Sequence, residues 1–158
     1  MSSFLDPSTL SDREAVADAV LRFAEGLDDG DADLLGSALL TEAVVDMSRV
    51  SETVGVMHGR AVVAEKLIGN LGKLDTTHHV SNFRIVVSGS TAELTCYALA
   101  QHFRPGEGRA QDREKAYMLR GNRYRAQLER AEDWWRIRTL TIDGVWVLGD
   151  SNLVTGPS

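Results

Sequence analysis

The sequence has little of several features that would point to an export route or a membrane. Its 158 residues contain one cysteine, Cys96, so no disulfide can form within the chain, which is typical of proteins in a reducing cytoplasm. No segment approaches the roughly 20 apolar residues that a membrane-spanning helix needs. Met1–Leu10 has neither the basic nor the apolar region of a secretory signal. We therefore expect a cytoplasmic protein with no membrane partner.

The signatures of common cofactor sites are also missing. The sequence has no Gly-x-Gly-x-x-Gly, no phosphate-binding lysine loop, no HExxH, no paired CxxC and no Gly-x-Ser-x-Gly. The histidines lack metal-ligand spacing from carboxylates. With 23 acidic and 17 basic residues the net charge is −6, which repels nucleic acid backbones. The sequence therefore predicts no cofactor, no metal and no nucleic acid partner.

What is present resembles an ordinary globular domain. Hydrophobic residues make up 43% of the chain and charged residues 25%, so general disorder is excluded. The length fits one sizeable core. We expect a single domain over residues 1–158, with a loose tail from about residue 155 to 158.

The first half of the sequence predicts helices. Ser11 and Glu14 form a capping box that begins a helix with an apolar stripe on one face. Gly30 ends this helix because it can adopt the left-handed conformation. Asp31 then caps a short second helix, and a third helix is expected at about Arg60–Leu71.

The second half predicts strands joined by tight turns. After an extended segment at Thr41–Ser48, the long strands are expected at Phe83–Val87, Thr91–Phe103, Lys115–Arg130 and Trp134–Leu148. Helices followed by a meander indicate an α+β fold. A long sheet with one covered face must curl, so we expect a cone-shaped, curved antiparallel sheet with the N-terminal helices packed on its concave face.

Asp28 is the first candidate for chemistry. It lies four residues after Ala24, so its side chain borders the buried face of the first helix. Burial and the negative end of the helix dipole both raise a carboxylate pKa there, unless a cationic partner such as an imidazolium offsets them. The alternative is a solvated acid within the acidic run that ends the helix.

The pair His78-His79 is the second candidate, since histidine is the usual general base. Successive side chains of a strand point to opposite faces, so one of the two should face the interior. Alternation from Phe83 and Ile85 selects His79, whereas a bulge near Ser81–Asn82 selects His78. The plainer interpretation is one core histidine and one surface histidine.

His102 is the third candidate, because it shares the parity of the small and apolar residues of its strand. It could line a pocket mouth or be a core histidine with satisfied hydrogen bonds. Cys96, on the same face, is most simply a small buried hydrophobe. Several arginines stand on the long strands with mixed parity, and one of them could meet an anionic ligand: Arg120, Arg123, Arg125, Arg136 and Arg138.

The layout and these residues together resemble the SnoaL-like family of the nuclear transport factor two-like superfamily. The resemblance covers about Asp12 to Asp150. It rests on four short motifs whose order and spacing are fairly specific: Gly26–Gly30, Thr76–Asn82, Tyr97–Phe103 and Trp135–Ile137.

The resemblance implies residue roles. The family includes enzymes similar to scytalone dehydratase, hexachlorocyclohexane dehydrochlorinase, bile acid dehydratase and the polyketide cyclases of secondary metabolism. The working aspartate and histidine of the dehydratase and dehydrochlorinase map onto Asp28 and His78, so the resemblance prefers His78 over His79. Two tyrosines of scytalone dehydratase map onto Leu27 and Met47, which speaks against that substrate. The candidate substrate-binding residues are His79, His102, Met47, Tyr97, Trp135 and Asn82.

The function implied is that of a cofactor-independent lyase or isomerase, of dehydratase or cyclase type. It would act on a hydrophobic, cyclic small molecule by Asp-His general base catalysis. The alternatives are a non-catalytic small-molecule-binding protein, or a structural small subunit similar to that of ring-hydroxylating dioxygenases. Because relatives are commonly dimers or trimers, a homodimer or homotrimer is expected.

Overall fold

A computed structural model describes residues 6–109 and 115–155. Residues 1–5, 110–114 and 156–158 lie outside these ranges, and the last three belong to the expected tail. The helices are η1 (Pro7–Thr9), α1 (Asp12–Asp29), α2 (Ala32–Ser37), α3 (Arg60–Leu71), η2 (Glu107–Arg109) and α4 (Asn152–Thr155). The strands are β1 (Leu39–Asp46), β2 (Val56–His58), β3 (Asp75–Ser88), β4 (Thr91–Phe103), β5 (Tyr117–Ala131) and β6 (Trp134–Gly149).

The helix boundaries follow from their caps. The capping box at the start of α1 is confirmed: the Ser11 hydroxyl accepts from the Glu14 amide at 3.3 Å, and Glu14 Oε2 accepts from the Ser11 amide at 2.8 Å. Gly30 ends α1 with a φ of 64°, in the left-handed region that favours glycine. Asp31 caps α2 through the amides of Asp33 and Leu34.

The strands of the described residues form one curved sheet in the order β2-β1-β6-β5-β4-β3. The expected α+β fold with a curved sheet is confirmed. All neighbours are antiparallel except β1 and β6, which pair in parallel, with Val45 opposite Leu140. This departure from a fully antiparallel sheet arises because the chain crosses to the far edge at β3 and returns by hairpins, which brings β6 beside β1 in the same direction.

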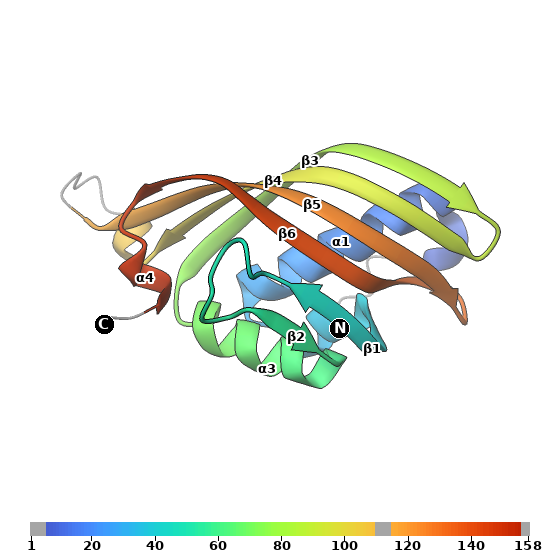
Figure 1. Ribbon diagram of the computed structural model, residues 1–158, viewed down its shortest axis with the longest axis horizontal. Helices are drawn as coiled ribbons and strands as arrows, with labels where there is room; N and C mark the ends of the chain where they lie inside the picture. Colours follow the sequence, from blue (N-terminus) through green and yellow to red (C-terminus); the bar gives the residue numbers. More distant parts are fainter. Residues whose placement is uncertain (1–5, 110–114, 156–158) are drawn as a thin grey trace.

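The core lies between the concave face of the sheet and the helices, as Figure 1 shows for α1 beneath the long strands. β4 alternates strictly, with Leu94, Cys96 and Ala98 buried and their neighbours exposed. α1 contributes Val20 and Phe23, which are fully buried. Within the described ranges, no helix has the length and apolar character needed to cross a membrane.

Candidate active site

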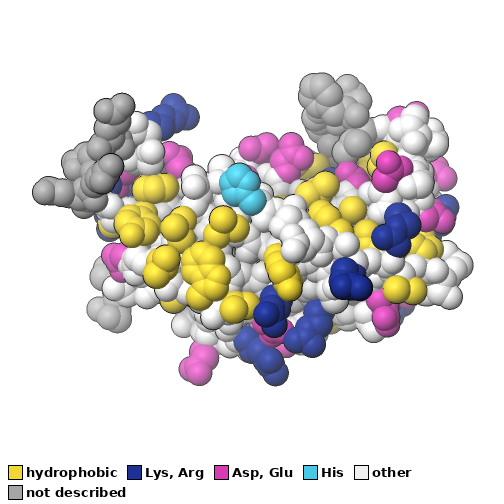
Figure 2. Space-filling view, turned by 90° about the horizontal axis from the view of Figure 1, so that it is seen from above, with side chains coloured by type: hydrophobic (Ala, Val, Ile, Leu, Met, Phe, Trp, Pro, Cys, Tyr) yellow, Lys and Arg dark blue, Asp and Glu magenta, His cyan; other side chains and the backbone are white. Residues whose placement is uncertain are grey.

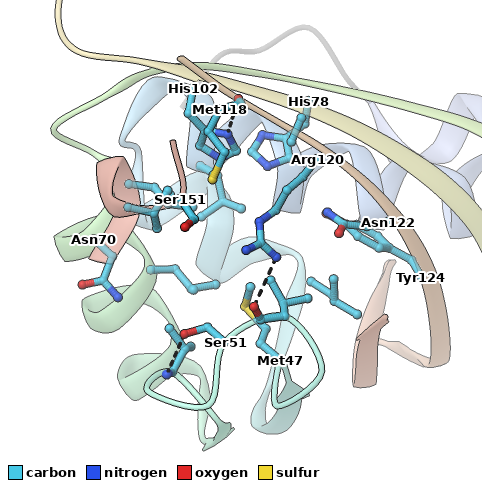
Figure 3. A pocket seen from close by; sticks show the side chains of 18 of the residues that line it. Met47, Ser51, Asn70, His78, His102, Met118, Arg120, Asn122, Tyr124 and Ser151 are labelled. Carbon is cyan, nitrogen blue, oxygen red and sulfur yellow. Dashed lines mark hydrogen bonds between the residues drawn. The ribbon is translucent and has the colours of Figure 1, made fainter. Parts of the chain in front are cut away.

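A cavity of ≈ 270 Å³ lies between the concave face of the sheet, α1, α3, α4 and the loop from β1 to β2 (Figure 3). This is near the lower end of the range of about 300–1,000 Å³ for ligand sites, and suits a small molecule. Most of the wall is apolar, with Phe23, Leu67 and Met118 among its residues. The polar side chains of the wall are those of Ser51, Asn70, His78, His102, Arg120, Asn122, Tyr124 and Ser151.

Asp28 and His78 are brought together at the edge of this cavity. The Asp28 carboxylate accepts three hydrogen bonds: from the Thr76 hydroxyl at 2.8 Å, from the His78 amide at 2.8 Å, and from His78 Nδ1 at 2.6 Å. The carboxylate lies at the end of α1, and its partners lie near the start of β3. Side-chain exposure is 5% for His78 and 19% for Asp28, so this short contact is largely shielded from solvent.

These contacts determine the tautomer of His78. Burial raises the pKa of Asp28, but the hydrogen bonds and charge of His78 and the hydroxyl of Thr76 outweigh it, so the net shift is downward. The carboxylate is therefore ionised at neutral pH and can only accept. Nδ1 must then carry the proton that it donates to Asp28 when His78 is neutral, which leaves Nε2 with a free lone pair. Because His78 lines the cavity and Asp28 does not, that lone pair is available to a ligand.

A bulge in β3 decides which histidine faces inward. The pairing with β4 shifts register between Ser81 and Arg84, and Asn82 adopts a φ of 59°, which asparagine tolerates better than most residues. The extra residue reverses the alternation expected from Phe83. His78 thus faces the interior, whereas His79 is exposed on the outer face and does not line the cavity.

His102 is buried and lines the cavity beside His78, with the ring centroids 6.1 Å apart in an edge-to-face arrangement. Its Nδ1 lies 3.3 Å from the carbonyl oxygen of Met118. Burial is the main cause that lowers the pKa of His102 to about 4. The charges of His78 and Arg120 lower it further, while the Met118 bond and Asp28 oppose the shift. The ring is therefore neutral at pH 7; it donates from Nδ1 to the carbonyl and keeps Nε2 as an acceptor.

Three polar residues of the cavity come from β5. From the sequence, Arg120 was named only as one of five arginines that could meet an anionic ligand, and the other two were not identified. Arg120, Asn122 and Tyr124 alternate along the strand with the same parity as the buried Ala126 and Leu128, a signal that the sequence does contain. Asn122 Oδ1 is buried and has no hydrogen-bond partner among the described residues, so a donor on a ligand could satisfy it.

Of the other predicted substrate-binding residues, one lines the cavity and the rest lie outside it. Met47 lines the cavity as expected. Tyr97 does not, because it lies on the outer face of β4 and is 49% exposed. Asn82 forms the bulge and is exposed, so it shapes the site only through the backbone. Trp135 is buried in the core outside the cavity lining, where its Nε1 donates to Asp12 Oδ1 at 3.3 Å.

Cys96 behaves as expected for a buried hydrophobe. Burial raises the pKa of its thiol to about 12, so a thiolate nucleophile is not available at neutral pH. Within residues 6–109 and 115–155, no three side chains of histidine, cysteine, aspartate or glutamate gather as metal ligands would.

The fold and this site define the class: an α+β cone with a buried acid–histidine pair at an apolar cavity. The chain belongs to the SnoaL-like domain family, whose model matches residues 8–141. That match includes Asp28, His78 and His102, so the resemblance first read from four short motifs is confirmed.

Several known proteins are similar to most of the chain. The chain is 33% identical over 144 residues to the terrestric acid biosynthesis cluster protein E of Penicillium crustosum, covering 89% of this chain and 88% of that protein. A crystal structure from Kribbella flavida, of the Kfla4162 protein, superposes with a TM-score of 0.79 at 19% identity, over 96% of this chain and 100% of the other. A hexachlorocyclohexane dehydrochlorinase of type 2 superposes with a TM-score of 0.71 at 20% identity, over 92% and 93%. At these identities the two structures establish the fold alone.

Proposed function

We propose that this chain is a cofactor-independent lyase or isomerase that begins its reaction by taking a proton from a carbon atom of a small hydrophobic, cyclic substrate. The observation that carries the proposal is the Asp28–His78 pair, whose 2.6 Å contact directs Nε2 of the imidazole to an apolar cavity. Membership of a family with a dehydrochlorinase of the same fold supports the reaction type.

In the proposed step, His78 Nε2 takes the proton, and the electron pair of the broken C–H bond forms a new double bond. The electrons either expel a leaving group or produce an enolate that is reprotonated elsewhere or attacks a carbonyl. The imidazolium then gives the proton to the departing group, to the carbon that is reprotonated, or to the alkoxide formed by attack on the carbonyl. Asp28 holds the ring in the required tautomer and stabilises its charged form, and its own protonation is not needed. A positioned general base contributes about 10²–10⁴-fold.

The test uses a neutral cyclic ketone, 2-tetralone, in D₂O, with deuterium entry at carbon followed by proton NMR. The wild-type protein should accelerate exchange, and both His78→Gln and Asp28→Asn should lower that acceleration by at least about 10²-fold. His79→Gln is the matched control, since the neighbouring ring is exposed and outside the cavity. If the ketone binds saturably and does not exchange, the chain is a binding protein and the proposal fails.

We also propose that the chain is one domain over residues 1–158, acts in the cytoplasm, and forms a homodimer or homotrimer. The last point rests on an apolar patch, visible among the hydrophobic side chains of Figure 2, on the outer face of the sheet. Tyr97, Leu99, Trp146 and Leu148 are each between 43% and 57% exposed there. A Cβ at Gly121 would overlap the indole of Trp146, so the glycine lets that ring lie against the strand. Apolar patches of this kind mark protein interfaces.

A further inference from the structure

Arg120 places a cation inside the cavity without a carboxylate to neutralise it. Its side chain is half-buried and extends from β5 to the middle of the cavity, below the ring of His78 (Figure 3). Its Nη1 donates to the carbonyl oxygen of Val50 at 3.2 Å. Among residues 6–109 and 115–155, no aspartate or glutamate forms an ion pair with it.

Three other arginines of the same sheet are paired with carboxylates, whereas Arg84, Arg123 and Arg136 form no ion pair among the described residues. Arg125 contacts Asp143, Arg130 contacts Asp12, and Arg138 contacts Glu129. Each of these pairs has more solvent access than the interior of the cavity, where a lone cation is least favourable. Burial lowers the pKa of Arg120, yet a guanidinium stays charged at any physiological pH. The cavity thus contains a partly buried guanidinium that has no carboxylate partner among the described residues.

The Asp28 carboxylate hydrogen-bonds Thr76 and His78 and forms no ion pair with Arg120. Its two carboxylate oxygens are occupied by Thr76 and by the amide and ring of His78, and it lies outside the cavity lining. The single bond to Val50 leaves the other N–H donors of the Arg120 fork unassigned in the described residues. That planar fork matches the two oxygens of a carboxylate.

We propose that Arg120 binds a carboxylate of the substrate, so that the natural substrate is a small hydrophobic organic acid. This inference rests on the proposed function, because it places the acid at one side of the cavity and the reacting carbon at His78. Arg120 is then a specificity-determining residue, and neutral analogues of the same shape bind more weakly.

The experiment measures binding by titration calorimetry of 2-naphthoate and of 2-naphthamide, a neutral molecule of nearly the same shape. The wild-type protein should bind the carboxylate at least about tenfold more tightly than the amide, the low end for a hydrogen-bonded charged group. Arg120→Met, which keeps an unbranched apolar stem and removes the charged fork, should abolish this preference. Arg120→Lys should retain part of it.

Arg123→Met is the matched control, since Arg123 stands on the same strand, faces outward and is exposed. It alters net charge equally and should leave the preference unchanged. If Arg120 only tethers the loop through Val50, Arg120→Met will weaken both probes alike, and the inference is overturned. Equal binding of the two probes by the wild type overturns it as well. The exchange assay with the neutral ketone contains no carboxylate, so either proposal can fail while the other stands.

Discussion

Replacing His102 with asparagine should make the stability of the protein less sensitive to acid. Burial lowers the pKa of His102 from 6.5 to about 4, so the folded state holds this ring neutral at pH values where the unfolded chain protonates it. The free energy of unfolding is therefore unaffected above pH 6.5 and falls as the pH drops towards 4. One pKa unit corresponds to about 1.4 kcal/mol, so the whole loss is about 3 kcal/mol, with about 2 kcal/mol of it present at pH 5.

Urea unfolding at pH 7 and pH 5, followed by tryptophan fluorescence, measures this loss. Asparagine has no titrating group, and its amide N–H can still donate to the Met118 carbonyl, so His102→Asn should lose about 2 kcal/mol less than the wild type between the two pH values. Asp28 does not interfere, because its pKa lies below 3.8 and its contribution is lost only at lower pH. Equal losses in both proteins would show that His102 is not held neutral by the fold, and would refute the reasoning.

Three further outcomes follow from the structure. In the exchange assay, the double variant Asp28→Asn and His78→Gln should be scarcely worse than the poorer single variant, because residues that act as a unit are non-additive; multiplied losses would mean separate roles. Arg22 binds Asp18 at 2.7 Å in the core, so Arg22→Met should destabilise the fold by about 3–5 kcal/mol in urea, and a loss well under 1 kcal/mol would contradict a buried pair. Sedimentation should show a dimer or trimer that Trp146→Lys shifts towards the 17.3 kDa monomer; a wild-type monomer at micromolar concentration contradicts the patch argument.

Local sequence signals predicted the helices α1, α2 and α3 and the strands β4 and β6 well. Residues only a few positions apart in the sequence determine the capping box, the left-handed Gly30 and the boundaries of α3 at Arg60–Leu71. These features agree with the structure. β4 has the predicted bounds, since a strict alternation of buried and exposed residues defines it. The short β2 and the parallel pairing of β1 with β6 were missed, because three residues carry no periodicity and strand pairing depends on segments far apart in the sequence.

The candidate site was harder to predict because it depends on which face each side chain occupies. Alternation alone selected His79, and one extra residue at the bulge reverses that choice. The sequence could suggest the bulge at Ser81–Asn82, but the register with β4 decides whether it forms. Thr76 was missed as a partner of Asp28 for the same reason. Its inward orientation depends on how side chains alternate between the two faces of β3 on the N-terminal side of the bulge.

The position of Asn82 links the backbone to the chemistry of the site. With the bulge, Thr76 and His78 share the inward face of β3 and both reach the carboxylate at the end of α1. Without the extra residue, the inward phase of Ile85 would continue to His79 and Thr77, and that pair would face inward in place of His78 and Thr76. A locally unfavourable backbone conformation at one exposed asparagine thus decides which threonine and which histidine reach the ionised carboxylate of Asp28.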